Sequence, residues 1–286
     1  MAVAIPTYKT TVYNDGAEAT AFVVDKPTSL AVGDLLICLI SYSNTSDLLA
    51  AQAGWTEFPV TATHETSRLH ALYKLATTTD VAASNFTITI DSEESGAIVM
   101  LRLTGVSTLQ IPYAVSQSKA EVNDDKTVSI DNTFDALANS FLLFVVNAKT
   151  GNSYSDLTVS DYAIATNNPS WTELLELSWI HGGSSNSTIS IATATRTQGG
   201  ATGNATFTLN TGATDTYVSG NCMIINLLEN KSFTKTETVT ATESDLLDLS
   251  SLTYTGTITE TDSVETEGDN WDNESKNSSS WTNTSK

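Results

Sequence analysis

The sequence predicts an all-β protein: an antiparallel β-sandwich, jelly-roll-like, built from two related halves and followed by an extended C-terminal tail. Three observations predict this class. Thr, Ser and Asn recur throughout, whereas long Leu/Glu/Lys/Ala stretches typical of helices are missing. The apolar runs end after about six to eight residues at Gly, Asn, Asp or Thr, which is strand length. The same order of segments also occurs twice. We therefore expect very little helix.

The first half contains five segments that read as strands or strand ends. Each is bounded by turn-forming residues and is rich in β-branched or aromatic side chains. In chain order they are GDLLICLI (33–40), GWTEF (54–58), RLHALYKLA (68–76), NFTITID (85–91) and GAIVMLRLTGV (96–106).

The second half repeats that order with NSFLLFVV (139–146), SWTELLEL (170–177), STISIATATRT (187–197), NATFTLN (204–210) and GNCMIINLLE (220–229). Aligned on these segments, three pairs of residues coincide: Trp55 with Trp171, Phe86 with Phe207, and Ile98 with Cys222. Five matching segments in one order are not expected by chance. We interpret 1–229 as a duplicated β-sandwich with halves of about 1–110 and 111–229.

Side-chain alternation predicts which strands are covered. In RLHALYKLA one face carries Leu69, Ala71, Tyr73 and Leu75, and the other carries Arg68, His70 and Lys74. We therefore expect one side of that strand to be exposed to solvent. The runs at 98–103 and 141–146 are apolar on both faces, which indicates cover by a second layer or by a neighbouring subunit. We expect one sandwich in which each half contributes strands to both sheets.

The composition changes after residue 229. Residues 231–286 carry eleven acidic residues and four lysines, too polar a mixture for a core of their own. Their alternating Thr-rich segments could form a hairpin or add to a sheet edge. We interpret 230–286 as a polar hairpin or extended anchoring tail.

The tail ends in a repeat, WDNESK at 271–276 and WTNTSK at 281–286, both of the form W-x-N-x-S-K. Trp is a favoured anchor at protein interfaces. We predict a partner-binding segment whose contact residues are Trp271, Asn273, Lys276, Trp281, Asn283 and Lys286.

Composition disfavours several functions. The formal net charge of −20 provides no basic stripe for nucleic acid or for an anionic membrane surface. We expect Cys38 and Cys222 to be free and buried. His64, Glu65 and His70 fit no metal signature, so a polar strand face is the better interpretation. Polar turns at 44–47 and 121–126 are likewise preferred to calcium loops. No nucleophile motif occurs, and we expect no enzyme activity, metal or cofactor.

The tryptophans have two interpretations. Trp55 and Trp171 hold equivalent positions in the two halves, which favours a role in folding. Trp179 is less constrained: it is either structural or stacks on a host-surface glycan.

The segments quoted above, from GDLLICLI to GNCMIINLLE, resemble a family of β-sandwich proteins found in tailed bacteriophages and prophages. The W-x-N-x-S-K pair is similar to short Trp/Asn/Ser/Lys repeats that end many phage structural proteins. The resemblance implies a non-enzymatic virion protein, most simply a capsid decoration or auxiliary protein. It also implies attachment through the tail to other virion proteins, such as the major capsid protein or tail subunits, and a homo-oligomer. The alternatives are a tail-associated carbohydrate-binding adhesin and a polysaccharide-degrading enzyme.

Overall fold

The computed structural model divides the chain into two compact units, Met1–Lys231 and Ser232–Lys286. The boundary expected from the sequence, after residue 229, lies two residues earlier. Within the two units the structure describes residues 3–260 except 15, 43–48, 59–61, 65–66, 109–113, 123–126, 131–134, 151–156, 182–184, 211–217, 230–232 and 242–251.

The first half of unit 1 forms one large and one small antiparallel sheet. The large sheet has the order β1 (Thr7–Tyr13), β8 (Gly96–Leu103), β3 (Leu35–Tyr42), β6 (Ser67–Leu75) and β4 (Thr56–Glu57), with β5 (Ala62–His64) also paired to β6. The small sheet pairs β2 (Ala19–Asp25) with β7 (Asn85–Glu94). A short helix, α1 (Thr78–Ala82), lies between β6 and β7, and it is the one helix of the described residues.

The second half is built in the same way. Its large sheet has the order β9 (Ala114–Val122), β18 (Val218–Leu228), β12 (Ser140–Thr150), β15 (Ser185–Arg196) and β14 (Thr172–His181). Its small sheet has the order β10 (Thr127–Ile130), β17 (Ala205–Asn210) and β13 (Thr158–Ile164). A two-residue ladder joins β11 (Asp135–Ala136) to β16 (Gly200–Ala201).

The two halves share their main order of strand pairing, although the second small sheet has one strand more than the first. In each large sheet the first strand of the half pairs with its last strand, which then pairs with the half's first long apolar strand, as in a jelly roll. The registers agree as well, because Val24 lies opposite Phe86 and Val128 lies opposite Phe207. A common origin of the halves by duplication remains a prediction.

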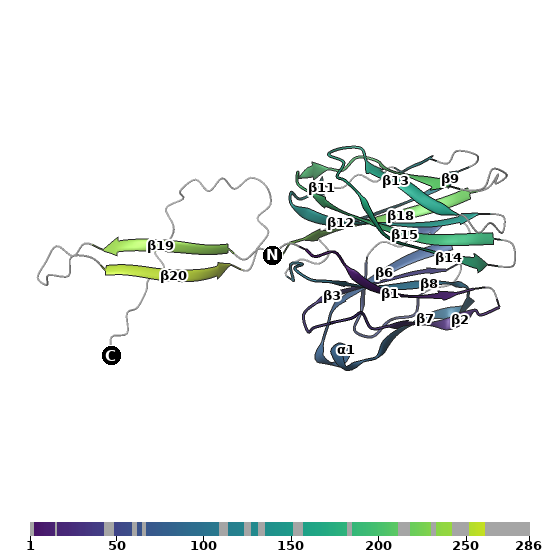
Figure 1. The fold of residues 1–286 in the computed structure, drawn as a ribbon, viewed down its shortest axis with the longest axis horizontal. Helices are drawn as coiled ribbons and strands as arrows, with labels where there is room; N and C mark the ends of the chain where they lie inside the picture. The colour runs from purple at the N-terminus through teal and green to yellow at the C-terminus, as the bar shows by residue number, and fades with distance from the viewer. Residues whose placement is uncertain are drawn as a thin grey trace, which may run out of the picture. The chain divides into compact units, whose positions relative to one another are not determined.

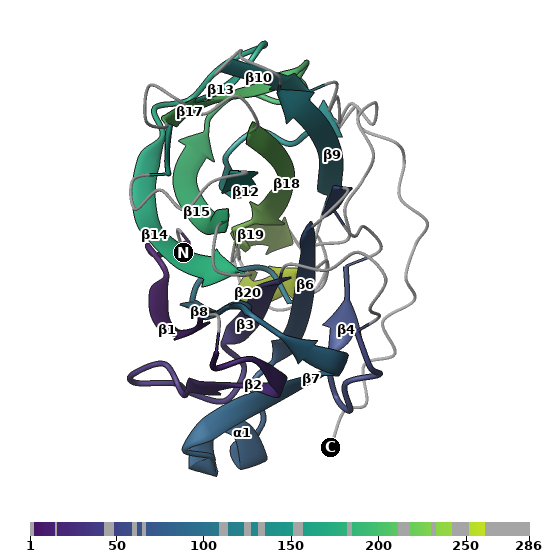
Figure 2. The ribbon, with the colours of Figure 1, turned by 90° about the vertical axis from the view of Figure 1, so that its right-hand side faces the viewer.

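Unit 1 has four layers. Figures 1 and 2 show the β2–β7 pair, the first large sheet, the second large sheet and the β10–β17–β13 sheet stacked in that order. Three hydrophobic cores fill the spaces between successive layers. The expectation of an all-β, jelly-roll-like sandwich is confirmed. The expectation that each half contributes strands to both sheets is wrong, because each half builds its own pair of sheets.

Strand β12 shows why its sequence is apolar on both faces. All eleven of its residues are buried. Leu143 and Val145 belong to the central core between the two large sheets, whereas Leu142 and Phe144 belong to the outer core beneath the small sheet. The cover on both faces therefore comes from layers of the same chain, and no neighbouring subunit is needed to explain the pattern.

The expectation that one face of β6 is exposed to solvent is wrong. Leu69 and Ala71 enter the central core as predicted, but His70 is only 3% exposed and Leu72 lies in the outer core of the first half. The outer core is closed by β7, which follows β6 in the chain, and by β2, which is distant in sequence. Polar residues on this face are therefore enclosed by a layer that the local pattern does not reveal.

The remaining structural expectations concern Trp and Cys. Trp55 is half-buried against the first outer core, with its ring 6.0 Å from that of Phe86 in a T-shaped pair. Trp171 packs edge-on against Phe144 in the second outer core at 5.4 Å. These contacts fit the folding role expected for both indoles. Cys38 and Cys222 are buried and form no disulfide bond, as predicted.

Unit 2 contains one antiparallel hairpin among its described residues. It pairs β19 (Phe233–Ala241) with β20 (Leu252–Glu260). Four directly opposed Thr–Thr pairs occupy alternate positions: Thr234 with Thr259, Thr236 with Thr257, Thr238 with Thr255, and Thr240 with Thr253. The tail thus takes the hairpin alternative over these residues.

Candidate functional site

The predicted anchor residues lie outside the described part of the chain. They are Trp271, Asn273, Lys276, Trp281, Asn283 and Lys286. Their partner-binding role therefore stays a prediction. The polar turn at 44–47 and most of the turn at 121–126 lie outside it as well.

Trp179 lies on β14 and is 1% exposed, within the central core between the two large sheets. Sugar stacking requires an indole face that a ligand can reach. The glycan-binding interpretation of Trp179 is therefore wrong in this fold. Trp179 packs in the central core, which agrees with the structural role considered as the other interpretation.

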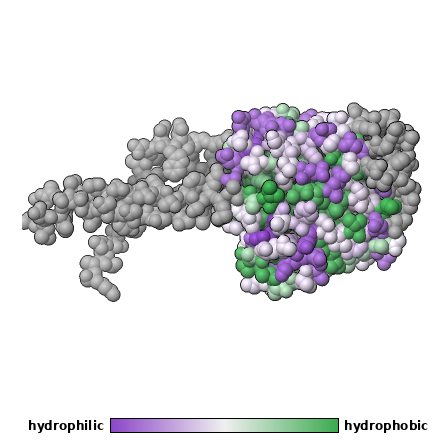
Figure 3. Space-filling view, viewed as in Figure 1, coloured by the Kyte–Doolittle hydropathy of each residue, from purple (hydrophilic) through white to green (hydrophobic). Residues whose placement is uncertain are grey.

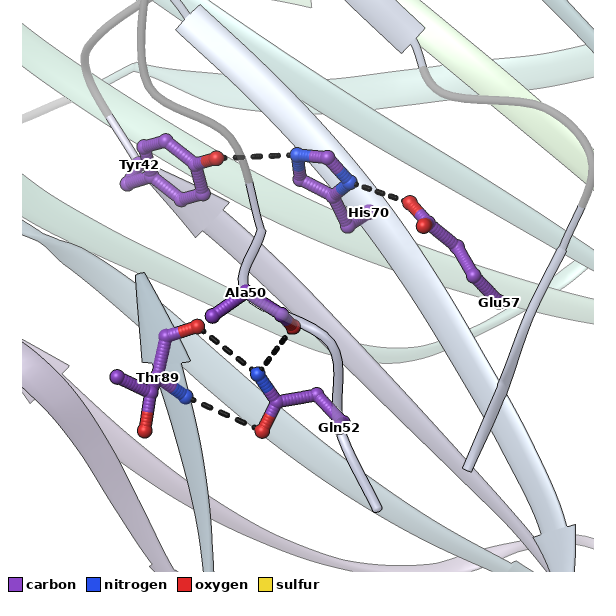
Figure 4. A network of polar contacts seen from close by, with 6 residues as sticks. All are labelled: Tyr42, Ala50, Gln52, Glu57, His70 and Thr89. Carbon is purple, nitrogen blue, oxygen red and sulfur yellow. Dashed lines mark hydrogen bonds and ion pairs between the residues drawn. The ribbon is translucent and has the colours of Figure 1, made fainter. Parts of the chain in front are cut away.

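A polar network of the first half joins Tyr42, His70 and Glu57 (Figure 4). The Tyr42 hydroxyl lies 3.0 Å from His70 Nε2, and His70 Nδ1 lies 2.7 Å from Glu57 Oε1. The three residues come from β3, β6 and β4. Tyr42 and His70 are buried, whereas the Glu57 side chain is 42% exposed, so Glu57 is the member that solvent reaches. The arrangement holds the imidazole in place but gives no substrate access to it.

A second contact set in Figure 4 fastens the segment before β4 to β7. Gln52 Nε2 donates to the carbonyls of Ala50 and Thr89, at 2.5 and 2.9 Å. Thr89 N donates back to Gln52 Oε1 at 3.3 Å. This amide therefore bridges the outer layer of the first half, which is a structural role.

Burial lowers the pKa of His70, and the hydrogen bond and charge of Glu57 oppose that effect without cancelling it. The nearby Arg68 also lowers the pKa. The folded protein consequently holds the neutral imidazole more firmly than the unfolded chain does.

We expect the stability of the protein to fall as pH decreases below about 6.5, the ordinary pKa of His. In that range the unfolded chain binds more protons than the folded one, so the His70 contribution is complete above this pH and is lost below it. A His70→Gln variant should lose stability less steeply in chemical denaturation between neutral and mildly acidic pH. Burial raises the pKa of Glu176, which gives an opposite slope, but both proteins share that group. If the unfolding free energy of the two proteins depended equally on pH, the assignment of this effect to His70 would be contradicted.

A groove of about 670 Å³ opens at one end of the second large sheet. It forms because β14 begins pairing with β15 at Thr172 opposite Thr193, whereas β15 continues to Arg196. The residues before Thr172 do not pair with Ala194–Arg196, so β15 lacks a β14 partner there. The lining residues are Ile5, Phe141, Asn167, Asn168, Pro169, Ser170, Thr172, Thr193, Ala194, Thr195, Thr197 and Gln198.

The wall at 167–170 is fixed by its own hydrogen bonds. Asn168 Oδ1 accepts from the backbone N–H of Ile164 at 3.0 Å and from Trp171 Nε1 at 2.9 Å. Asn167 adopts a left-handed backbone with φ of 51°, and Pro169 restricts the next turn. Sequence analysis missed this groove. Its one local signal is the Asn-Asn-Pro turn, which by itself indicates only a loop.

The described residues contain no cluster of three or more His, Cys, Asp or Glu side chains suited to a metal ion. Within the same residues, no helix is both long and apolar enough to cross a membrane. In comparisons with known proteins, no protein-family model, no curated protein and no solved structure matches this chain.

Proposed function

We propose that this chain is a non-enzymatic structural protein of a tailed-phage virion, a capsid decoration or auxiliary protein held on the particle by its C-terminal tail. The proposal draws its phage context from the family resemblance of the sequence. The proposed attachment through the tail rests on the division of the chain into two compact units.

The observation that carries the proposal is that unit 1 covers its own central strands. Both faces of β12 are buried by layers of the same chain, and every described residue of the three cores belongs to unit 1. The cover of these strands is therefore accounted for by described residues of unit 1. Two Trp residues in a polar segment are then best explained as contacts to something else.

The same observation changes the expected partner. Strands apolar on both faces suggested contacts between copies of the body, but those faces are occupied internally. Figure 3 shows polar and apolar residues interspersed over the visible face of unit 1. We therefore assign the attachment to the tail and to another virion protein, and homo-oligomer formation stays a secondary part of the proposal.

The hydrolase alternative gains no support from the groove. Glycoside hydrolysis uses a pair of carboxylic side chains across the bond to be cleaved. Among the part of the chain that the structure describes, none of the twelve residues lining the groove is Asp or Glu. The adhesin alternative keeps the groove as its supporting feature, now without Trp179.

The proposal is tested by crosslinking intact particles with a lysine-reactive reagent and mapping the linked peptides. Lys276 and Lys286 should join a different virion protein, whereas Lys9 of β1 serves as the comparison from the body. Crosslinks of both tail lysines confined to their own chain would contradict attachment through the tail.

A further inference from the structure

The groove beside the end of β15 has an unusual charge balance for this chain. Its twelve described lining residues include no Asp, Glu, Lys, Arg or His, although the whole sequence carries 33 acidic and 13 basic residues. A charged ligand would gain no ion pair from these side chains. The lining chemistry therefore selects for an uncharged ligand.

The lining side chains suit hydroxyl groups. Asn167, Ser170, Thr195 and Gln198 are exposed and supply amides and hydroxyls that both donate and accept hydrogen bonds. Ile5, which is 73% exposed, adds apolar surface to the same lining. Alternating hydroxyls and C–H faces are the surface that a sugar ring presents, and this groove offers both complements.

The side-chain amide of Asn168 is held in one orientation by hydrogen bonds within the protein. The two acceptor positions of its Oδ1 are occupied by Ile164 N and Trp171 Nε1, so the orientation of the amide is decided. The two N–H donors of the same amide then remain to serve a ligand. Holding a polar group in one orientation reduces the entropy lost on binding.

A peptide fits the site less well. The edge of β15 lacks its β14 partner only from Ala194 to Arg196, whereas strands in globular proteins usually run for about five or six residues. An added strand would find few backbone partners over that length. We infer that the groove is a binding site for a neutral oligosaccharide, recognised by Asn167, Asn168, Ser170, Thr195 and Gln198. This inference does not depend on how the tail attaches.

The inference is tested on the intact chain by saturation-transfer difference NMR, with dissociation constants from titration. The probes are maltohexaose, cellohexaose and mannohexaose, with oligogalacturonate of equal length as the acidic comparison. At least one neutral probe should bind, and the acidic one should not. The double variant Thr195→Val and Gln198→Ala should weaken binding by about tenfold or more, since it removes hydrogen bonds worth about 1 kcal/mol each.

Matched controls separate the groove from general surface effects. Thr89→Val and Asn85→Ala alter exposed residues of β7 in the other half and should leave binding unchanged. Ser170→Ala gives an independent reading if the double variant changes the melting temperature. Absence of binding by all three neutral probes, or equal affinity in the double variant, overturns the inference. Displacement of a bound probe by the peptide WTNTSK would instead assign the groove to the tail and overturn it too.

Discussion

Trp179→Ala is expected to lower the free energy of unfolding of unit 1 by about 3–5 kcal/mol, the range for removing a fully buried large aromatic side chain. Trp179 is 1% exposed and lies in the central core, where residues from both large sheets meet. The loss should come from packing alone. Among the described residues its Nε1 has no hydrogen-bond partner, so truncation breaks no hydrogen bond there.

Two further variants sharpen the Trp179 measurement. Trp179→Phe keeps most of the buried volume and should cost under about 2 kcal/mol, as conservative core replacements do. Trp171→Ala removes a half-buried indole and should cost less than Trp179→Ala. Equilibrium denaturation gives all three values. An unfolding free energy of the Trp179→Ala protein equal to that of the wild type would contradict the four-layer arrangement, because it would place this side chain in solvent.

The central core also explains why the halves are expected to unfold together. Leu101 and Met223 belong to the same core although one comes from each half. The Trp179→Ala substitution removes contacts on both sides of that core. The loss should therefore appear as one shifted transition in calorimetry rather than as early melting of one half.

Local sequence patterns were sufficient for the long central strands and their order. They missed other strands, such as β2, β9 and β13, and the number of layers. The alternation in β12 places Leu143 and Phe144 on opposite faces, and the structure agrees. The alternation does not predict which strands cover each face of β12. Cover depends on strands such as β2 and β17, which lie far away in the chain.

The same limit applies to His70. Its position among Arg68 and Lys74 is typical of a solvated strand face, yet its neighbours in space are Tyr42 and Glu57. Those contacts depend on strand pairing between β3, β6 and β4, which single-strand periodicity does not encode. Polar residues on β6 could therefore be placed on a face, but their burial could not be predicted.

The groove was beyond sequence reasoning for a related reason. It results from a difference in length between β14 and β15, combined with the turn fixed by Asn168. Each segment alone reads as an ordinary strand or loop. The site arises only when Ile5, Asn167 and Thr195 are brought together from three separate parts of the chain.

Deletion of residues 267–286 is expected to abolish incorporation into particles while leaving the body folded. The described residues of all three cores belong to unit 1, so the melting temperature of its transition should be unchanged. The deletion removes both W-x-N-x-S-K segments, which the proposal makes the attachment points. The double variant Trp271→Ala and Trp281→Ala should reproduce the loss without shortening the chain.

Quantifying this chain in purified particles, with the deletion and the wild type expressed to equal levels, tests the account most directly. The account predicts that the truncated protein is soluble, folded and absent from the particles. Truncated protein present in particles at the wild-type level would contradict attachment through the tail.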